Sequence, residues 1–210
     1  MGVITITKKF GAALTAGIIL AACFGSVAQA GPLSNYDAGR FEIHAGGNIP
    51  NSTETGNHKM RKKNSAYFGG TVGLGSNVGL NYKWDELKGR LARMRAQEVN
   101  LMYRFIPCVS FYAGYLNADA KSTSWRGNGY RRNSAHVGLQ ADVNVPELFD
   151  VWANFAYGSK HNYYEIGLSK PIIPNIDFDV SYYHQKYDDA LRGDDTFKGR
   201  GIKVGLTVKI

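Results

Sequence analysis

Charged side chains occur at alternate positions along much of the chain, a spacing that puts them on one side of extended segments. Both signs of charge and two histidines are present, so this side offers the groups that bind or guide ions. Unpaired charges in a tight interior are costly, so these groups are expected instead to pair with one another and fill the interior. We predict that twelve residues line this interior: Glu42, His44, Lys83, Glu98, Arg104, His136, Asp142, Glu165, Asp177, Asp179, Lys203 and Lys209.

A second set of groups with possible chemistry is concentrated near the C-terminus. His184, Asp188, Asp189, Asp194 and Asp195 share one polar segment, and His161 lies in another. Acid pairs beside a histidine can activate water, and an Asp-rich loop can hold Ca²⁺, but EF-hand spacing and a usable Ser, His, Asp set are absent from the sequence. We therefore expect a solvated loop, and no catalytic residue, metal or cofactor.

The basic residues gather in the polar segments between the alternating stretches, and the chain as a whole has a formal net charge of +8. Arginine and lysine at such positions can bind phosphate groups, arginine through two parallel hydrogen bonds. A general contribution to solubility explains the same charges. The residues predicted to contact phosphates are Lys62, Lys63, Arg93, Arg95, Arg131 and Arg132.

The N-terminus resembles an export signal. Lys8 and Lys9 precede an uncharged run over 10–27, and Ala28 and Ala30 provide the small residues of a cleavage site. We predict that residues 1–30 are removed, which leaves a single domain over 31–210 with a short tail at 31–39. A retained anchor and lipidation at Cys23, within a lipobox-like 20–23, are the alternatives. Export makes nucleic acid an improbable partner.

The remaining sequence is dominated by a period of two, the signature of β-strands. The pattern predicts an all-β chain of ten antiparallel strands, with eight as the alternative, in an up-and-down order. Their approximate ranges are 40–48, 66–74, 78–85, 98–105, 109–115, 135–144, 151–157, 164–169, 177–183 and 202–210.

One segment fits two structures. Residues 86–95 are strongly basic and are interpreted as a protruding hairpin tip. Trp84, Leu87, Leu91 and Met94 also have helical spacing, so a short helix is the alternative.

Glycine indicates which face of the strands points inward. Gly69, Gly73, Gly138, Gly167 and Gly205 lie on the polar face, where a narrow lumen needs space beside bulky neighbours. The apolar face carries many Tyr, Phe and Trp residues near strand ends, as expected at the two surfaces of a bilayer. We therefore predict a transmembrane barrel, and keep a soluble lipocalin-like barrel as the alternative.

The last strand carries a motif of the pattern polar, x, Gly, x, x, apolar, x, apolar, met by Lys203, Gly205, Val208 and Ile210. With this motif, residues 40–210 resemble the small outer-membrane β-barrel proteins of Gram-negative bacteria, the porin-like and OmpA-like barrels. The resemblance implies short periplasmic turns, longer extracellular loops, contact with lipopolysaccharide, and periplasmic chaperones and the barrel assembly machinery as partners in biogenesis. It gives no oligomeric state, and a monomer is consistent with it.

These patterns favour an integral outer-membrane barrel that acts as a structural envelope protein or as a narrow passive channel. A barrel enzyme acting on envelope lipid or peptide is the first alternative, because omptin-type proteases use acidic pairs with a histidine on ten strands. A soluble or lipidated carrier is the second.

Overall fold

A computed structural model describes residues 32–33, 35–56, 58–122, 130–145, 148–190 and 196–210. The predicted signal over 1–30, with Cys23 and Ala30, lies outside these residues. Ten long strands dominate the described chain: β1 (Phe41–Thr55), β4 (Ser65–Gly75), β5 (Val78–Gly89), β6 (Ala92–Ile106), β7 (Val109–Ser122), β8 (Tyr130–Val145), β9 (Phe149–Gly158), β10 (His161–Ile173), β11 (Ile176–Tyr187) and β12 (Phe197–Lys209). The two-residue strands β2 (His58–Lys59) and β3 (Lys62–Lys63) lie between β1 and β4.

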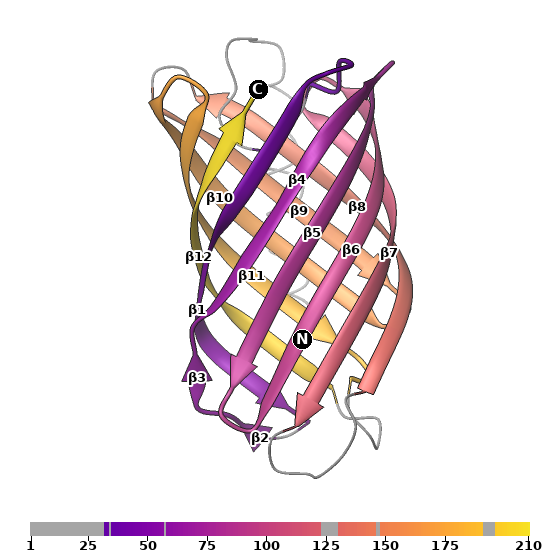
Figure 1. The fold of residues 1–210 in the computed structure, drawn as a ribbon, viewed down its shortest axis with the longest axis vertical. Helices are drawn as coiled ribbons and strands as arrows, with labels where there is room; N and C mark the ends of the chain where they lie inside the picture. Colours follow the sequence, from indigo (N-terminus) through magenta and orange to yellow (C-terminus); the bar gives the residue numbers. More distant parts are fainter. Residues whose placement is uncertain (1–31, 34, 57, 123–129, 146–147, 191–195) are drawn as a thin grey trace, which may run out of the picture.

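The long strands form one closed antiparallel sheet (Figure 1). Each pairs with the next in the chain, and β12 pairs with β1 over a register that includes Gly46 opposite Gly205. The register partner of Phe41 on β4, the partner of that residue on β5, and so on around the barrel form a path that crosses every long strand. This path returns to β1 at Glu54 and not at Phe41. This offset means that the strands are strongly tilted, as closure of a barrel requires.

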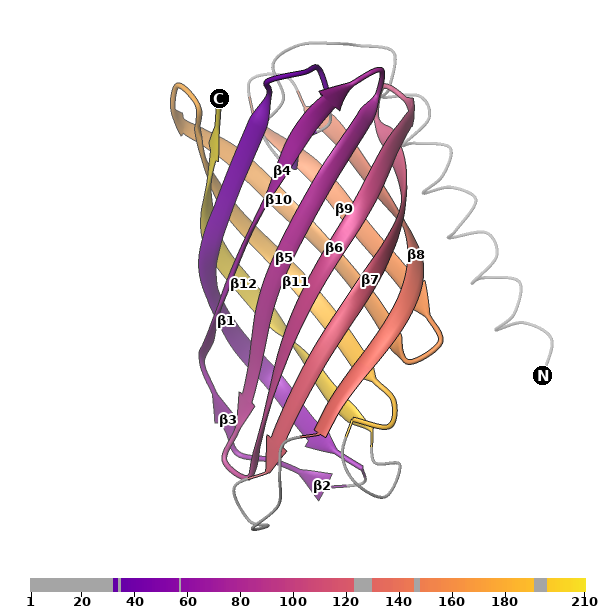
Figure 2. The same cartoon turned by 45° about the vertical axis from the view of Figure 1, so that its right-hand side comes forward.

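The predicted up-and-down barrel of ten strands is therefore confirmed, and eight strands is wrong. Both ends of the barrel's own chain, at Phe41 and Ile210, lie at one end of the barrel, which we call the termini end (Figures 1 and 2). Tight turns connect the strands there: Ser76 and Asn77 have positive φ angles of 51° and 64° between β4 and β5. The opposite end, which we call the loop end, carries β2 and β3.

The basic segment 86–95 forms a hairpin, and the helical alternative is wrong. Pairing of β5 with β6 continues to Lys88 opposite Arg93, and only Arg90 and Leu91 separate the two strands. The strands extend further than predicted because their inward residues, such as Leu87 and Met94, are buried inside the barrel. Trp84, Leu87, Leu91 and Met94 have helical spacing because apolar side chains occur on both faces of this hairpin.

The two faces of the sheet differ sharply in polarity. Outward side chains such as Leu101 and Val137 are apolar and 57% and 60% exposed, whereas inward ones such as Asn100 and Thr207 are polar and buried. Gly138 faces Tyr112, and a Cβ at this glycine would lie 2.1 Å from the tyrosine ring. The polar face is therefore the inside, as the glycines predicted, and the exterior needs an apolar environment to cover it. No helix in the described ranges has the length and apolar character needed to cross a bilayer.

Candidate functional site: a lumen closed at both ends

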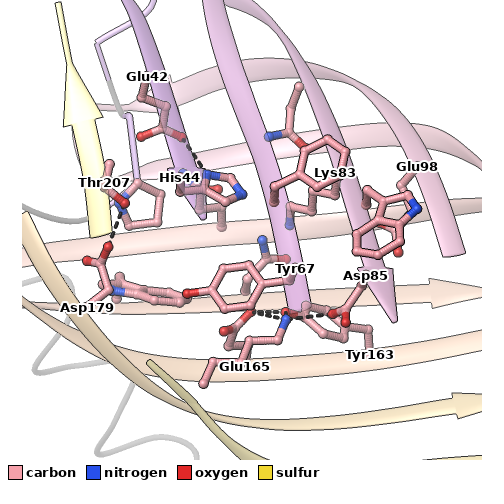
Figure 3. A pocket seen from close by; sticks show the side chains of 18 of the residues that line it. Glu42, His44, Tyr67, Lys83, Asp85, Glu98, Tyr163, Glu165, Asp179 and Thr207 are labelled. Atoms are coloured by element: carbon pink, nitrogen blue, oxygen red, sulfur yellow. Dashed lines mark hydrogen bonds and ion pairs between the residues drawn. The ribbon is translucent and has the colours of Figure 1, made fainter. Parts of the chain in front are cut away.

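The middle of the lumen contains a polar cavity of about 80 Å³, which we call the central cavity (Figure 3). Its wall is drawn from strands all around the barrel. Ten of the lining side chains are Glu42, His44, Tyr67, Lys83, Asp85, Glu98, Tyr163, Glu165, Asp179 and Lys203. A space of this size holds a few water molecules and no larger solute.

Lys203 of β12 is the most heavily contacted cation of the cavity wall. Its Nζ lies 2.8 Å from Asp85 Oδ2 and 3.5 Å from Glu165 Oε2, and donates to the hydroxyl of Tyr163 at 3.2 Å. The same ammonium group lies 5.0–5.3 Å from the ring centres of Tyr67, Tyr163 and Tyr183. It therefore cross-links β5, β10 and β12 through charge and through cation–π contact.

Lys83 and Glu98 form a second group across the cavity. Lys83 Nζ lies 5.9 Å and 5.6 Å from the ring centres of Tyr112 and Tyr163. Glu98 faces the Nε2 atoms of His136 and His161, 3.9 Å and 4.0 Å away. These distances are beyond hydrogen-bond reach, so the carboxylate is bordered by two imidazoles without being tied to either.

The termini end of the lumen is filled by the chain itself. We call residues 32–39 the tail, and its described part turns back into the barrel. Tyr36 is fully buried, donates a hydrogen bond to Ser110 Oγ at 3.0 Å, and packs on Gly79, where a Cβ would lie 2.9 Å from the tyrosine ring. The backbone N–H of Leu33 donates to Glu42 Oε2 at 2.5 Å.

The loop end of the lumen is filled by apolar side chains, which we call the apolar layer. It consists of buried side chains that include Met60, Leu87, Met94, Leu116, Tyr187 and Phe197. Gly89 and Gly199 make space for it, because a Cβ at either would come within 2.9 Å of Met60 or 2.7 Å of Leu87. In the described ranges, this layer therefore places apolar side chains across the loop end of the lumen.

The structure brings together most of the predicted lumen residues. Glu42, His44, Lys83, Glu98, Glu165, Asp179 and Lys203 line the central cavity, and His136 lies beside Glu98. Asp142 and Asp177 are buried nearer the termini end, where Lys209 Nζ lies 2.9 Å from Asp177 Oδ2. Arg104 is different, because its guanidinium bonds Asn77 Oδ1 in the β4–β5 turn, at the rim of the barrel.

The predicted phosphate contacts all lie at the loop end, but they do not all point outward. On the outer face, Glu86 Oε1 accepts from Arg95 Nε at 3.2 Å and lies 3.7 Å from Arg93 Nε, while Glu86 Oε2 lies 2.6 Å from Lys88 Nζ. We call the cations Lys63, Lys88, Arg93, Arg95 and Arg131 the cation belt; Lys63 pairs with Lys88 in register, and Arg131 is exposed on β8. Lys62 is exposed too, but it pairs with Gly89, which faces the lumen, so it lies on the other face of β3.

Arg132 does not belong to this belt, and its prediction as a phosphate contact is wrong. Its Nε donates to the backbone oxygen of Asp189 at 2.9 Å, and the side chain lines a small internal void with Met94 and Leu116. The reason is the strand period: Arg131 and Arg132 are neighbours on β8, so their side chains point to opposite faces.

The insertion motif lies on the strand that closes the barrel. Lys203 and Gly205 face the lumen, and Gly205 sits against the hydroxyl of Tyr67, where a Cβ would come within 2.2 Å. Val208 pairs with Ile43, and the backbone N–H of Ile210 donates to Phe41 O at 2.9 Å.

The acidic segment near the C-terminus does not converge on one site in the part that the structure describes. The ring of His184 stacks on Tyr164 at 4.9 Å, Asp188 accepts from Lys186, and Asp189 bonds Lys160. This hydrogen bond from Lys160 holds the pKa of the partly exposed Asp189 below its usual value. Asp194 and Asp195 lie outside the described residues. Across the described ranges, no group of three or more His, Cys, Asp or Glu side chains is placed to hold a metal ion.

Sequence reasoning missed three contributors to the lumen. His161 was assigned to a loop, yet it begins β10 and is fully buried against Tyr187, with ring centres 4.7 Å apart. The tail residues Leu33 and Tyr36 were given no role. The apolar Leu33 and Tyr36, set in an otherwise polar stretch, were the one available signal for burial of the tail.

Comparison with known proteins yields similar structures and no similar sequences. No family model matches the chain, and no curated protein matches it. Neisserial surface protein A is 14% identical, with a TM-score of 0.49, and the match covers 82% of this chain and 99% of that one. Ail, the attachment invasion locus protein of Yersinia pestis, is 14% identical over the same shares, with a TM-score of 0.36.

The outer membrane protein OprG from Pseudomonas aeruginosa is 13% identical with a TM-score of 0.31, and the match covers 85% of this chain and 99% of that one. At this level of identity, function does not transfer. The stronger evidence is internal to the structure: a closed ladder, an apolar exterior and a packed polar lumen. Together these features identify the chain as a small β-barrel of the outer-membrane type.

Proposed function

We propose that the protein is an integral outer-membrane barrel of the Gram-negative envelope that serves as a structural element and does not conduct. The observation that carries the proposal is the closure of the lumen at both ends, by the tail and by the apolar layer. Ten strands enclose a lumen only slightly wider than one that side chains fill. In the membrane, the termini end faces the periplasm and the loop end faces outward.

A narrow passive channel is the competing function, and conductance measurement separates the two. Purified protein inserted into a planar bilayer is expected to give a flat current trace. A variant that removes both closures, Leu87→Ala with Phe197→Ala and residues 32–39 replaced by Gly and Ser, serves as the positive control. Discrete current steps from the unmodified protein would show that the lumen is a pore.

Compartment is tested separately by fractionation. We propose that the protein is exported, that residues 1–30 are removed near Ala30, and that periplasmic chaperones and the barrel assembly machinery deliver it to the outer membrane. The protein is then expected in the outer-membrane fraction, with heat-modifiable migration on detergent gels. A soluble periplasmic product would instead support the ligand-carrier alternative. Loss of an envelope hydrolase activity in His184→Ala or Asp188→Asn would support the barrel enzyme.

We further infer that the cation belt binds phosphate groups of outer-leaflet lipid, lipopolysaccharide being the expected lipid. The supporting observation is Glu86, whose carboxylate is almost fully buried beneath Lys88, Arg93 and Arg95 and holds these cations together on the outer face. One acid among three cations leaves a net positive surface next to the apolar exterior, at the height where lipid phosphates lie.

The lipid proposal is tested by thermal stabilisation in detergent. Added lipopolysaccharide is expected to raise the melting temperature of the unmodified protein, and the gain is expected to disappear in Lys88→Gln/Arg93→Gln/Arg95→Gln. Lys170→Gln, which removes an exposed cation near the termini end, is the matched control and should keep the gain. Equal stabilisation by dephosphorylated lipid would contradict phosphate binding.

A further inference from the structure

Because the strands are tilted, a row of register partners climbs obliquely across the exterior of the barrel (Figure 2). Its members on β6 to β11 are, in order, Leu101, Ala113, Val137, Tyr157, Asn162 and Lys186. The row is part of the path that leaves β1 at Phe41, at the termini end, and returns to β1 at Glu54, near the loop end. Five steps of about 4.8 Å between neighbouring strands give the row a length of about 24 Å, and Lys186 lies at its upper end, toward the loop end.

The apolar members of this row lie in a groove of about 930 Å³ on the exterior, which we call the outer groove. Ala113 and Val137 have short side chains, so the surface is recessed at β7 and β8. Exposed aromatic side chains project around them, and those that line the groove include Tyr103, Phe111, Phe155, Tyr157 and Tyr164. The volume is comparable to that of the two acyl chains of a phospholipid, and it is small for the larger set of chains on lipopolysaccharide.

Basic side chains continue the row beyond the groove, at the loop end. Lys186 of β11 and Lys198 of β12 are directly opposite each other, and Arg200 is the next outward residue of β12. We call these three cations the β11–β12 patch. Like charges directly opposite each other destabilise a sheet, so an anion beside them is favourable. Asp188 compensates Lys186, with its Oδ1 2.8 Å from the lysine Nζ.

Lys198 and Arg200 are the two cations of the patch without such a partner. Within the described ranges, neither side chain makes a hydrogen bond or an ion pair. Glu54 lies opposite Lys198 on β1, but its Oε1 accepts a hydrogen bond from Ser52 Oγ at 2.8 Å. Two adjacent cations on the outer face, neither of them in an ion pair, match the oxygens of one phosphate group.

Stacked rings join the β11–β12 patch to the outer groove. Tyr164 lines the groove, and its ring centre lies 4.9 Å from that of His184, with an angle of 8° between the two planes. His184 is in turn the register partner of Arg200. Positive charge at the loop end is therefore continuous with a recessed apolar surface below it. An amphiphile with an anionic head requires this arrangement.

We propose that the outer groove and the β11–β12 patch together bind one glycerophospholipid, with its phosphate at Lys198 and Arg200 and its acyl chains along the groove. The inference rests on the membrane location proposed above. The patch shares no residue with the cation belt, which lies on β3, β5, β6 and β8. The geometry favours a phospholipid over lipopolysaccharide, because two cations without an ion pair suffice for a single phosphate and because the groove is small.

Native mass spectrometry tests the proposal by counting the lipids bound to the barrel. The protein is purified from outer membranes, exchanged extensively into fresh detergent, and titrated with phosphatidylglycerol, whose phosphate is its only charged group. Diacylglycerol with the same chains tests the contribution of the phosphate, and glycerol phosphate tests that of the chains. We expect one phosphatidylglycerol to bind at concentrations at which neither of the other two compounds binds.

Two variants separate the halves of the site. Lys198→Gln/Arg200→Gln removes the two charges that face the phosphate, and Ala113→Phe fills the groove. Each change is expected to weaken binding of phosphatidylglycerol at least about tenfold, the first through lost charge-assisted hydrogen bonds and the second through lost apolar contact. Heat-modifiable migration on detergent gels checks that both variants form the barrel.

Two matched control variants leave this site intact. Ala45→Phe adds the same ring at an exposed outward position of β1, outside the outer groove. The triple Gln variant of the cation belt, described above, removes charges elsewhere at the loop end. Both controls should bind phosphatidylglycerol like the unmodified protein. Lys198→Gln/Arg200→Gln should in turn keep the thermal stabilisation by lipopolysaccharide, so the two lipid sites are tested independently.

The proposal is overturned by unchanged binding in either site variant, by an equal loss in Ala45→Phe, or by equal binding of diacylglycerol. Displacement of phosphatidylglycerol by lipopolysaccharide would overturn it as well. None of these results alters the fractionation or the current trace, so failure of the lipid site is distinct from failure of the proposed function. Recovery of the protein in the soluble fraction would refute the membrane location and the lipid site together.

Discussion

Replacement of Lys203 by methionine tests whether the buried charge network holds the barrel together. Methionine keeps most of the side-chain volume and removes the ammonium group that lies 2.8 Å from Asp85 and 3.5 Å from Glu165. Two buried carboxylates then lose their shared cation.

The expected loss in the free energy of unfolding depends on the hydrogen bonds that the two carboxylates keep. Loss of one partner of a buried ion pair costs about 3–5 kcal/mol. Asp85 retains hydrogen bonds from Asn48 and Gln185, and Glu165 retains hydrogen bonds from Ser181 and Tyr163. Four neutral donors soften the loss, so we expect the lower end, about 3 kcal/mol.

The assay is reversible urea unfolding in detergent micelles, followed by tryptophan fluorescence. Refolding of purified chain avoids the assembly machinery, so the place of Lys203 in the insertion motif does not affect the result. The control is Lys203→Met combined with Asp85→Asn and Glu165→Gln, which removes the charges together and should recover most of the loss. A single variant that loses less than about 1 kcal/mol, or a triple variant no more stable than the single one, would refute the reasoning.

Three further results are expected. Gly138→Ala should destabilise the barrel by about 1–3 kcal/mol in the same urea assay, because its Cβ would overlap the ring of Tyr112. The control Gly47→Ala should be neutral, because the nearest atom to its Cβ lies 3.8 Å away. Equal effects of the two changes would contradict the packing argument. Leu101→Arg on the exterior should cost about 2–4 kcal/mol when unfolding is measured from lipid vesicles, and a neutral result would mean that this face does not contact lipid. The pKa of Asp189, measured by NMR titration, should lie below the ordinary value for aspartate. The stability that this group contributes is therefore present at neutral pH and is lost as the pH falls through the lowered pKa. A pKa at or above the ordinary value would contradict the bond to Lys160.

Much of the architecture was predictable because it depends on local alternation. Strand count, strand order and the inward face follow from period two and from glycines such as Gly138, which a neighbouring ring requires. The same period separates Arg131 from Arg132, and the prediction that placed both on the outer face ignored it.

The remaining features depend on contacts across the lumen, which the sequence pattern does not contain. Glu98 and His161 come from β6 and β10, which are not neighbours in the sheet, so their approach depends on strand tilt and register. Tyr36 lies in a stretch without periodicity, and its burial depends on the space left by Gly79. The hairpin over residues 86–95 was predicted from the sequence, but the burial of Leu87 and Met94 inside the barrel follows only from the register of β5 and β6.

Pairing of β1 with β12 also dictates when this protein is able to fold. The two strands lie at opposite ends of the barrel sequence, so any fragment that lacks residues 197–209 has two unpaired edges and an apolar face with no closed lumen behind it. Folding must therefore wait for the last residues to be synthesised and delivered, and an early stop codon produces an aggregation-prone open sheet rather than a smaller barrel.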